Sequence, residues 1–327
     1  MPVDFGPELT SIPRFMTESQ QQGAAPRRLL VIYNPTAGGS RRRRFEAVLT
    51  ALADFRCDLD VRPTTGPGDA AVLARQADPA AYDLVVAAGG DGTVNEVING
   101  LVGDAGGDAA VARPPLAVLP LGTANVLAAE LGLDLVPAHI ARVIAQGPVH
   151  TVCLGRASSG AGAGRIFSLM AGAGFDARVV AAVDLRVKRV LGKGAYVLEG
   201  LRQMCRRRPA PLSVTVDGKG YEAASVVVSN SRFYGGRYLL APDASLAEPL
   251  FHVCLFRHGD PLHILRYGAA LQTGRLIGMA GFEIVTGREV VIEGDRDAPL
   301  QADGDIIARL PVRISAVPDV LRMVTAG

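Results

Sequence analysis

The sequence predicts an α/β protein with two domains, a parallel-sheet domain followed by a β-rich, sandwich-like domain. Three short apolar runs, 29–33, 84–88 and 116–119, each lead into a turn of small residues and then into apolar residues at helical spacing. This alternation is typical of a parallel sheet whose ligand sites lie beyond the carboxyl ends of its strands. Near 146–149 the pattern changes to short strands, and 327 residues are enough for two cores.

Composition narrows the class of protein. With 49% hydrophobic and 20% charged residues, the composition is typical of a folded protein. A net charge of +2 argues against the broad basic surface of a nucleic-acid-binding protein. Four cysteines without paired spacing argue against a thiolate metal site or a disulfide framework, and they fit a cytoplasmic protein. No signal peptide is recognisable at the start, and no run of ~18 apolar residues occurs, so membrane contact is expected to be peripheral.

The first strand–turn–helix unit follows a loose leader over 1–25. Leu29 to Tyr33 is expected to be a buried strand, 34–40 a small-residue turn, and 45–55 a helix with one apolar face. Four arginines, 41–44, stand at the start of this helix. They could hold phosphate charge, or they could form a solvated first turn, because consecutive residues point around a helix. A strand ending near Thr64 and a helix from Asp69 to Gln76 come next.

The central unit contains the most informative turn. The strand 84–88 leads into Gly89-Gly90-Asp91-Gly92-Thr93, and a helix is expected from Thr93 to Asn99-Gly100. Glycines allow an anion to approach the backbone closely, and a helix start presents N–H groups to a phosphate. Asp91 beside a polyphosphate would require a divalent cation. The alternative is a tight turn with a solvated aspartate.

The third unit repeats this arrangement. A buried strand, 116–119, runs into a turn containing Gly122 and Thr123, and a helix extends through Leu131. Thr123 could instead cap that helix. The three turns are expected to share one edge of a Rossmann-like parallel sheet, because they all follow strands of the same sheet.

The central turn and its continuation resemble a known family. Gly89 to Thr93, followed by Val94-Asn95-Glu96-Val97-Ile98-Asn99-Gly100, is similar to the nucleotide signature of diacylglycerol-kinase-type lipid kinases, which include sphingosine and ceramide kinases. The resemblance implies an ATP-binding domain over 26–148. Its implied nucleotide-binding residues are Asn34, Thr64, Gly89, Gly90, Asp91, Gly92, Thr93, Asn95, Gly122 and Thr123. One departure is Val126, where the best-known lipid kinases have an aspartate.

The second domain is predicted over 149–317, with 318–327 as a C-terminal segment that could return to the first domain. Expected strands cover 149–155, 166–170, 212–216, 223–229 and 251–256, interrupted by helical passages at 176–204 and 261–277. The passage 179–208 mixes apolar and basic residues. It could lie on an anionic bilayer or pack as a surface helix on the sheet.

Two further elements of the second domain resemble family motifs. The loop 241–251 matches a structural Mg²⁺ loop, with Glu248 as the acid and Ser245 and Leu250 supplying backbone carbonyls, although relatives usually have aspartate and glycine at 248 and 249. Asp303-Gly304-Asp305 resembles an Asp-Gly-Glu element that supplies the acceptor-side acid. Asp303 is then the candidate general base and Asp305 its helper. Asp-Gly is also common hairpin-turn chemistry.

The function these expectations support is ATP- and Mg²⁺-dependent phosphorylation of a hydroxyl on a diacylglycerol- or sphingoid-like lipid. Asp91, Asp303 and Asp305 are the expected catalytic residues. A lipid substrate and a membrane surface are the expected partners, a nucleic acid is not, and a homodimer is compatible with the sequence. The alternatives are an NAD-kinase-like activity on a soluble dinucleotide and a nucleotide-binding regulator without catalysis.

Overall fold

A computed structural model describes residues 27–36, 40–103, 113–160, 164–175, 177–178 and 211–327. The predicted leader 1–25 and the basic passage 179–208 lie outside these residues, as does nearly all of the helical passage 176–204. Within the described residues no helix is both long enough and apolar enough to cross a membrane.

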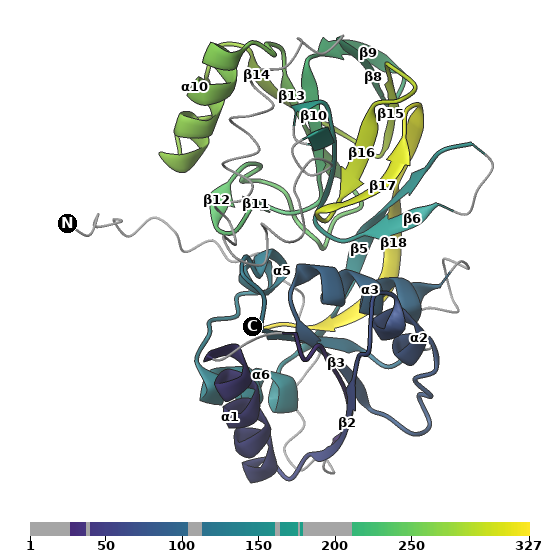
Figure 1. Cartoon of the computed structure of the whole chain (residues 1–327), viewed down its shortest axis with the longest axis vertical. Helices are drawn as coiled ribbons and strands as arrows, with labels where there is room; N and C mark the ends of the chain where they lie inside the picture. The colour runs from purple at the N-terminus through teal and green to yellow at the C-terminus, as the bar shows by residue number, and fades with distance from the viewer. Residues whose placement is uncertain (1–26, 37–39, 104–112, 161–163, 176, 179–210) are drawn as a thin grey trace.

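The first domain is a parallel sheet covered by helices (Figure 1). Its strands lie in the order β2 (Asp58–Pro63), β1 (Arg28–Tyr33), β3 (Leu84–Gly89), β4 (Leu116–Pro120), and all neighbours are parallel. Every residue of β3 and β4 is buried, as expected for central strands covered on both faces. The helices are α1 (Ser40–Asp54), α2 (Asp69–Arg75), α3 (Asp91–Val102), α5 (Val126–Glu130) and α6 (Pro137–Gln146).

The last strand of the chain extends this sheet into the second domain. The end of β18 (Val312–Val324) pairs with β4 in parallel, Met323 opposite Leu116, and most of its length is antiparallel to β5 (Val149–Ser158). The sheet then continues through β15 (Glu289–Glu293) and β8 (Leu212–Val216) to β9 (Lys219–Ala223), and β6 (Arg165–Phe167) joins the free side of β5. The predicted boundary at 148/149 falls between α6 and β5.

A second, antiparallel sheet completes a β-sandwich. Its order is β14 (Phe282–Gly287), β13 (Phe251–Phe256), β10 (Ser225–Ser229), β7 (Met170–Ala173), β16 (Pro299–Ala302), β17 (Asp305–Arg309). One apolar cluster joins side chains of both sheets, among them Val214, Val290 and Ile314 with Val226, Phe251 and Leu300. The hairpin β11 (Phe233–Tyr234) and β12 (Tyr238–Leu239) and the helix α10 (Pro261–Gln272) lie outside the two sheets. The predicted α/β fold with a β-rich second domain is confirmed.

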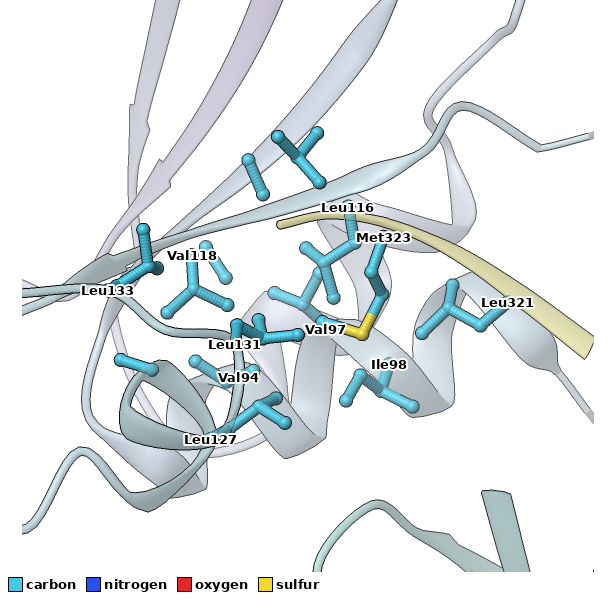
Figure 2. Close-up of a cluster of buried hydrophobic side chains, with 14 of the residues drawn as sticks. Val94, Val97, Ile98, Leu116, Val118, Leu127, Leu131, Leu133, Leu321 and Met323 are labelled. Atoms are coloured by element: carbon cyan, nitrogen blue, oxygen red, sulfur yellow. The ribbon is translucent and has the colours of Figure 1, made fainter. Parts of the chain in front are cut away.

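Helix α3 lies at the centre of the first domain's core. Figure 2 shows Val94, Val97 and Ile98 of α3 surrounded by apolar side chains of β4, α5 and β18. Eight of its residues are buried, including the polar Thr93 and Asn95. Because it is packed on several sides, α3 is a rigid support for the residues at its start.

Several predicted boundaries differ from those in the structure. Helix α3 begins at Asp91 rather than Thr93, because Gly90 stands as an extended N-cap. The single strand predicted over 166–170 is two strands, β6 and β7, separated at 168–169. Similarly, Ala224 divides the predicted strand 223–229 into β9 and β10, and α10 ends at Gln272. Helix α6, which starts on Pro137, was not predicted.

Close packing of α2 on α3 makes Gly100 a sensitive position. A Cβ atom there would overlap the Ala71 carbonyl oxygen and lie 2.8 Å from Ala74 Cβ. We expect Gly100→Ala to lower the free energy of unfolding by ~1–3 kcal/mol, because overpacking outweighs the gain in helix propensity. Gly92→Ala, on the same helix but with no atom within 4 Å of the new Cβ, serves as the control. Urea unfolding followed by circular dichroism measures both, and equal midpoints would contradict the packing argument.

Candidate active site

The carboxyl ends of the first domain's central strands bring the predicted loops together. Tyr33 pairs with Ala88, and Gly89 pairs with Pro120, so the three turns start side by side. The Leu121 N–H donates to the Gly89 carbonyl at 2.8 Å. A Cβ on Gly122 would lie 2.5 Å from the Gly90 Cα, so the close approach of these two loops requires glycine.

Polar side chains tie the first turn to the start of α3. The Asn34 side-chain amide donates to Thr93 Oγ1 at 3.0 Å, and its oxygen accepts the Thr36 N–H at 3.0 Å. The Thr64 N–H donates to the Tyr33 carbonyl at 2.8 Å, which places Thr64 beside the same turn. Gly90 is an extended N-cap and supplies no capping side chain, so the first N–H groups of α3 are available to an anion.

The four arginines at the start of α1 divide into two pairs. Arg41 Nη2 donates to Thr123 Oγ1 at 2.8 Å, and Arg44 Nη1 donates to the Pro120 carbonyl at 3.2 Å. Arg42 instead pairs with Glu46 along the helix, and Arg43 is exposed. Two arginines therefore reach the third loop while two form the solvated face. Thr123 does not cap α5, whose N-cap is Asn125.

Asp91 is a partly buried acid rather than a solvated one. Its Oδ1 accepts the Leu127 N–H at 3.2 Å, at the start of α5. Burial raises the pKa of the Asp91 carboxyl, the N–H groups at the start of α5 oppose this, and the nearby Asp303 raises the pKa further. A backbone donor at the start of α5 therefore holds the Asp91 carboxylate in place.

Asp303 occupies the tip of the β16–β17 hairpin. Asp303 (φ 48°) and Gly304 (φ 90°) form a two-residue turn, because Ala302 pairs with Asp305. The predicted hairpin turn is therefore present, and the acid roles of Asp303 and Asp305 stay predictions. Asp305 is exposed at the first position of β17.

The Asp303 carboxylate accepts five hydrogen bonds. Its donors are Asn95 Nδ2 (2.7 Å), Ser168 N (2.7 Å), Ser168 Oγ (2.9 Å), Leu169 N (2.9 Å) and Met170 N (3.1 Å). Burial raises the pKa of Asp303, and the backbone donors at 168–170 counteract part of that rise. These donors also explain the interruption between β6 and β7, since their N–H groups point to a carboxylate instead of a neighbouring strand.

Side chains of α3 and α5 connect the first domain to the second. One helical turn after Asn95, the Asn99 side chain donates to the Ile166 carbonyl at 3.0 Å and accepts the Ile166 N–H at 3.1 Å. Arg232 pairs with the buried Glu130 of α5 at 2.9 Å. Helix α3 therefore carries the glycine loop at its start and contacts the acid of the second domain one turn later.

The predicted Mg²⁺ loop forms a tight turn. The Glu248 N–H donates to the Ser245 carbonyl at 3.2 Å, and the Leu250 N–H donates to the Glu248 carbonyl at 2.8 Å. Glu248 is exposed. No group of three or more His, Cys, Asp or Glu side chains able to hold a metal occurs in the part of the chain that the structure describes. The assignment of Ser245, Glu248 and Leu250 as ligands stays a prediction.

Sequence reasoning overlooked several residues of this region. The spacing of Asn95 and Asn99, four residues apart on one helix face, is a signal that could have identified Asn99. No local pattern points to Ser168, or to the pairing of Glu130 with Arg232, because those contacts join segments far apart in the chain.

Comparison with known families defines the class of this two-domain arrangement. Residues 28–157 match the diacylglycerol kinase catalytic domain, and residues 170–325 match the YegS C-terminal NAD kinase beta sandwich-like domain. A solved structure from Bacillus anthracis str. Sterne, described as a candidate diacylglycerol kinase, superposes with a TM-score of 0.77 at 25% identity and covers 94% of this chain and 98% of that one.

Individual relatives agree with the domain matches. The chain is 29% identical to the diacylglycerol kinase of Bacillus subtilis over 87% of this chain and 92% of that protein. It is 30% identical to a Pseudomonas aeruginosa protein named "Probable lipid kinase YegS-like", over 90% of this chain and 93% of that protein. The chain belongs to the diacylglycerol-kinase-type family of lipid kinases.

Because the Asp91 carboxyl is partly buried, its charge should affect the thermal stability of the protein in a way that depends on pH. An acid whose pKa is raised by folding destabilises the folded state above its folded-state pKa, and this penalty disappears as pH falls below the unfolded value near 3.8. We therefore expect Asp91→Asn to raise the thermal midpoint at neutral pH, with a gain that shrinks toward zero on acidification. Scanning calorimetry across pH measures this, with Asp54→Asn, an exposed acid of α1, as the charge-matched control. A gain independent of pH would contradict the assignment.

Proposed function

We propose that this protein transfers the γ-phosphoryl group of ATP to a hydroxyl of a diacylglycerol- or sphingoid-like lipid. Membership of the lipid kinase family supports the class of reaction. The observation that carries the proposal is the hydrogen bond of 2.7 Å from Asn95 Nδ2 to the Asp303 carboxylate, which joins the helix that begins at the glycine loop to an acid of the second domain. Phosphoryl transfer needs a phosphate cradle and an acceptor-side acid in one place.

The loops of the first domain are the proposed nucleotide site. The N–H groups at Gly90 to Thr93 and the α3 start would receive phosphate oxygens, and Asn34 and Thr64 would line the same edge. Gly89, Gly92, Asn95, Gly122 and Thr123 complete the proposed set. Arg41 and Arg44 add positive charge at the third loop, where their guanidinium groups are already held by Thr123 and the Pro120 carbonyl.

Asp303 is the proposed general base. The acceptor oxygen forms a bond to the γ-phosphorus as the bond to the departing ADP oxygen breaks, and the hydroxyl proton passes to the Asp303 carboxylate. Burial raises the pKa of Asp303 toward the range useful at neutral pH. Among its five donors, the Ser168 hydroxyl can rotate to accept a hydrogen bond instead of donating one, so Ser168 can accommodate the protonated acid. Asp305 is proposed to assist from the exposed side of the hairpin.

Asp91 would bind a Mg²⁺ ion that accompanies the nucleotide. Such an ion would neutralise part of the phosphate charge. The N–H groups of α5 keep the Asp91 carboxylate oriented toward the loops. Peripheral membrane contact, a second Mg²⁺ at 245–250 and a homodimer remain additional proposals for this protein.

Radiolabelled ATP with diacylglycerol or sphingosine in detergent micelles tests the reaction. We expect label in the lipid for the wild type and a loss of about 10²-fold or more for Asp91→Ala and Asp303→Asn, because each removes a charged group from the reacting centre. Asp54→Asn should retain wild-type turnover. Labelling of NAD in place of lipid would support a dinucleotide kinase instead, and nucleotide binding without turnover would support a regulator.

The arginine pair gives a second test of the nucleotide site. We expect Arg41→Gln to raise the KM for ATP by about tenfold, because it removes a charge-assisted contact near the phosphates. Arg43→Gln, two residues away on the exposed face of α1, is the matched control and should leave the KM unchanged. Steady-state kinetics at saturating lipid measure both, and similar values for the two variants would remove Arg41 from the site.

A further inference from the structure

Helix α10 exposes an apolar face. Only four large hydrophobic side chains in the described residues are more than half exposed, namely Leu262 (55%), Leu265 (53%), Ile277 (55%) and Val136 (54%). Three of them belong to α10 or to the segment just after it. An exposed group of this kind marks a surface that meets another apolar partner.

The orientation of α10 is fixed by its opposite face. Tyr267 is its buried residue; the Tyr267 hydroxyl donates to the Gly281 carbonyl at 2.9 Å, and its ring packs edge-on against Phe256. Leu262 and Leu265 lie one turn apart on the face away from these contacts, followed by the exposed Ala269. Figure 1 shows α10 at the end of the second domain remote from the parallel-sheet domain. The leucines are therefore held outward rather than poised to fold back.

The charge around this face is positive. Arg266 lies four residues after Leu262, and Arg275 precedes Ile277; both are exposed and neither pairs with an acid among the described residues. The neighbouring acids are already engaged. Asp260 caps α10 and bonds the His263 ring at 2.7 Å, and Glu283 pairs with Arg257 at 2.5 Å. The face thus combines outward leucines with uncompensated arginines.

We propose that exposed residues of α10 and of the segment after it dock the protein on an anionic lipid bilayer: Leu262, Leu265 and Arg266 on α10, and Arg275 and Ile277 after its end. Apolar side chains would enter the interfacial region, and the arginines would contact anionic headgroups. The charge complementarity favours a bilayer over a second copy of the chain, whose equivalent face carries the same positive charge. The inference rests on the proposed function, since an acceptor embedded in a bilayer must be reached by a protein docked on it.

Vesicle co-sedimentation tests the surface. The full chain is mixed with phosphatidylcholine vesicles or with vesicles also containing phosphatidylglycerol. We expect stronger binding to the anionic vesicles, a reduction of about fivefold or more for the double variant Leu262→Asn/Leu265→Asn, and loss of the phosphatidylglycerol preference for Arg266→Gln/Arg275→Gln. Val72→Asn, an exposed apolar position on α2, and Arg43→Gln are the matched controls.

Specific outcomes overturn the docking proposal. The proposal is wrong if the leucine variants bind vesicles as well as the wild type does. It is also wrong if the wild type binds vesicles equally well with and without phosphatidylglycerol. Sedimentation equilibrium without lipid measures the molar mass of the protein in solution. If the leucine substitutions lower this mass, the face is a contact between copies of the chain. Circular dichroism of each variant establishes that loss of binding is not loss of folding.

A short-chain diacylglycerol, soluble as monomers, separates docking from catalysis. The leucine variants should phosphorylate this acceptor with wild-type kcat/KM and lose activity only on vesicle-embedded diacylglycerol. If the wild type phosphorylates neither acceptor, the proposed function fails, while sedimentation still decides the docking surface. Equal activity of the leucine variants on both acceptors would show that α10 has no role at the bilayer.

Discussion

The five hydrogen bonds to the Asp303 carboxylate are the interaction on which the geometry of the candidate site depends. A buried carboxylate is costly unless its oxygens are satisfied, and here backbone N–H groups of 168–170, the Ser168 hydroxyl and the Asn95 amide satisfy them. To supply those donors, the chain interrupts a strand between β6 and β7 and holds Asp303 in the left-handed region. One donor, Asn95, belongs to the other domain. The acid is thus part of the contact between domains.

That contact makes α3 the element that sets the geometry of the site. Its first residues form the glycine loop, and Asn95 and Asn99, one and two turns later, bond the second domain. The helix is enclosed by β4, α5 and β18 (Figure 2), so it behaves as a rigid spacer between the proposed phosphate cradle and the proposed base. A nucleotide bound at the start of α3, as proposed, would therefore meet the proposed base, which the same helix contacts, without a large rearrangement of either domain.

The sequence predicted those features of the fold that depend on local patterns of residues. Apolar runs followed by glycine turns identified β1, β3 and β4 and the shared edge at their carboxyl ends, because strand burial and turn chemistry are encoded within a few residues. The sequence did not predict features in which groups of one segment form hydrogen bonds with residues far away in the chain. The division of 166–170 follows from Asp303, some 135 residues away in the chain, and the engagement of Thr123 by Arg41 spans 82 residues. Periodicity carries no information about such partners.

Val126, which departs from the family pattern, is compatible with the distribution of charge at the candidate site. Its side chain is buried in the core of the first domain, while the N–H groups at the start of α5, including its own, favour the ionised Asp91. An acid at this position would put a negative charge into the apolar core of the first domain, where burial disfavours the ionised form. With valine there, the position is filled by an apolar side chain, and the backbone N–H groups that favour the ionised Asp91 remain. The charge of the site is thereby concentrated in the two acids that the proposed reaction uses.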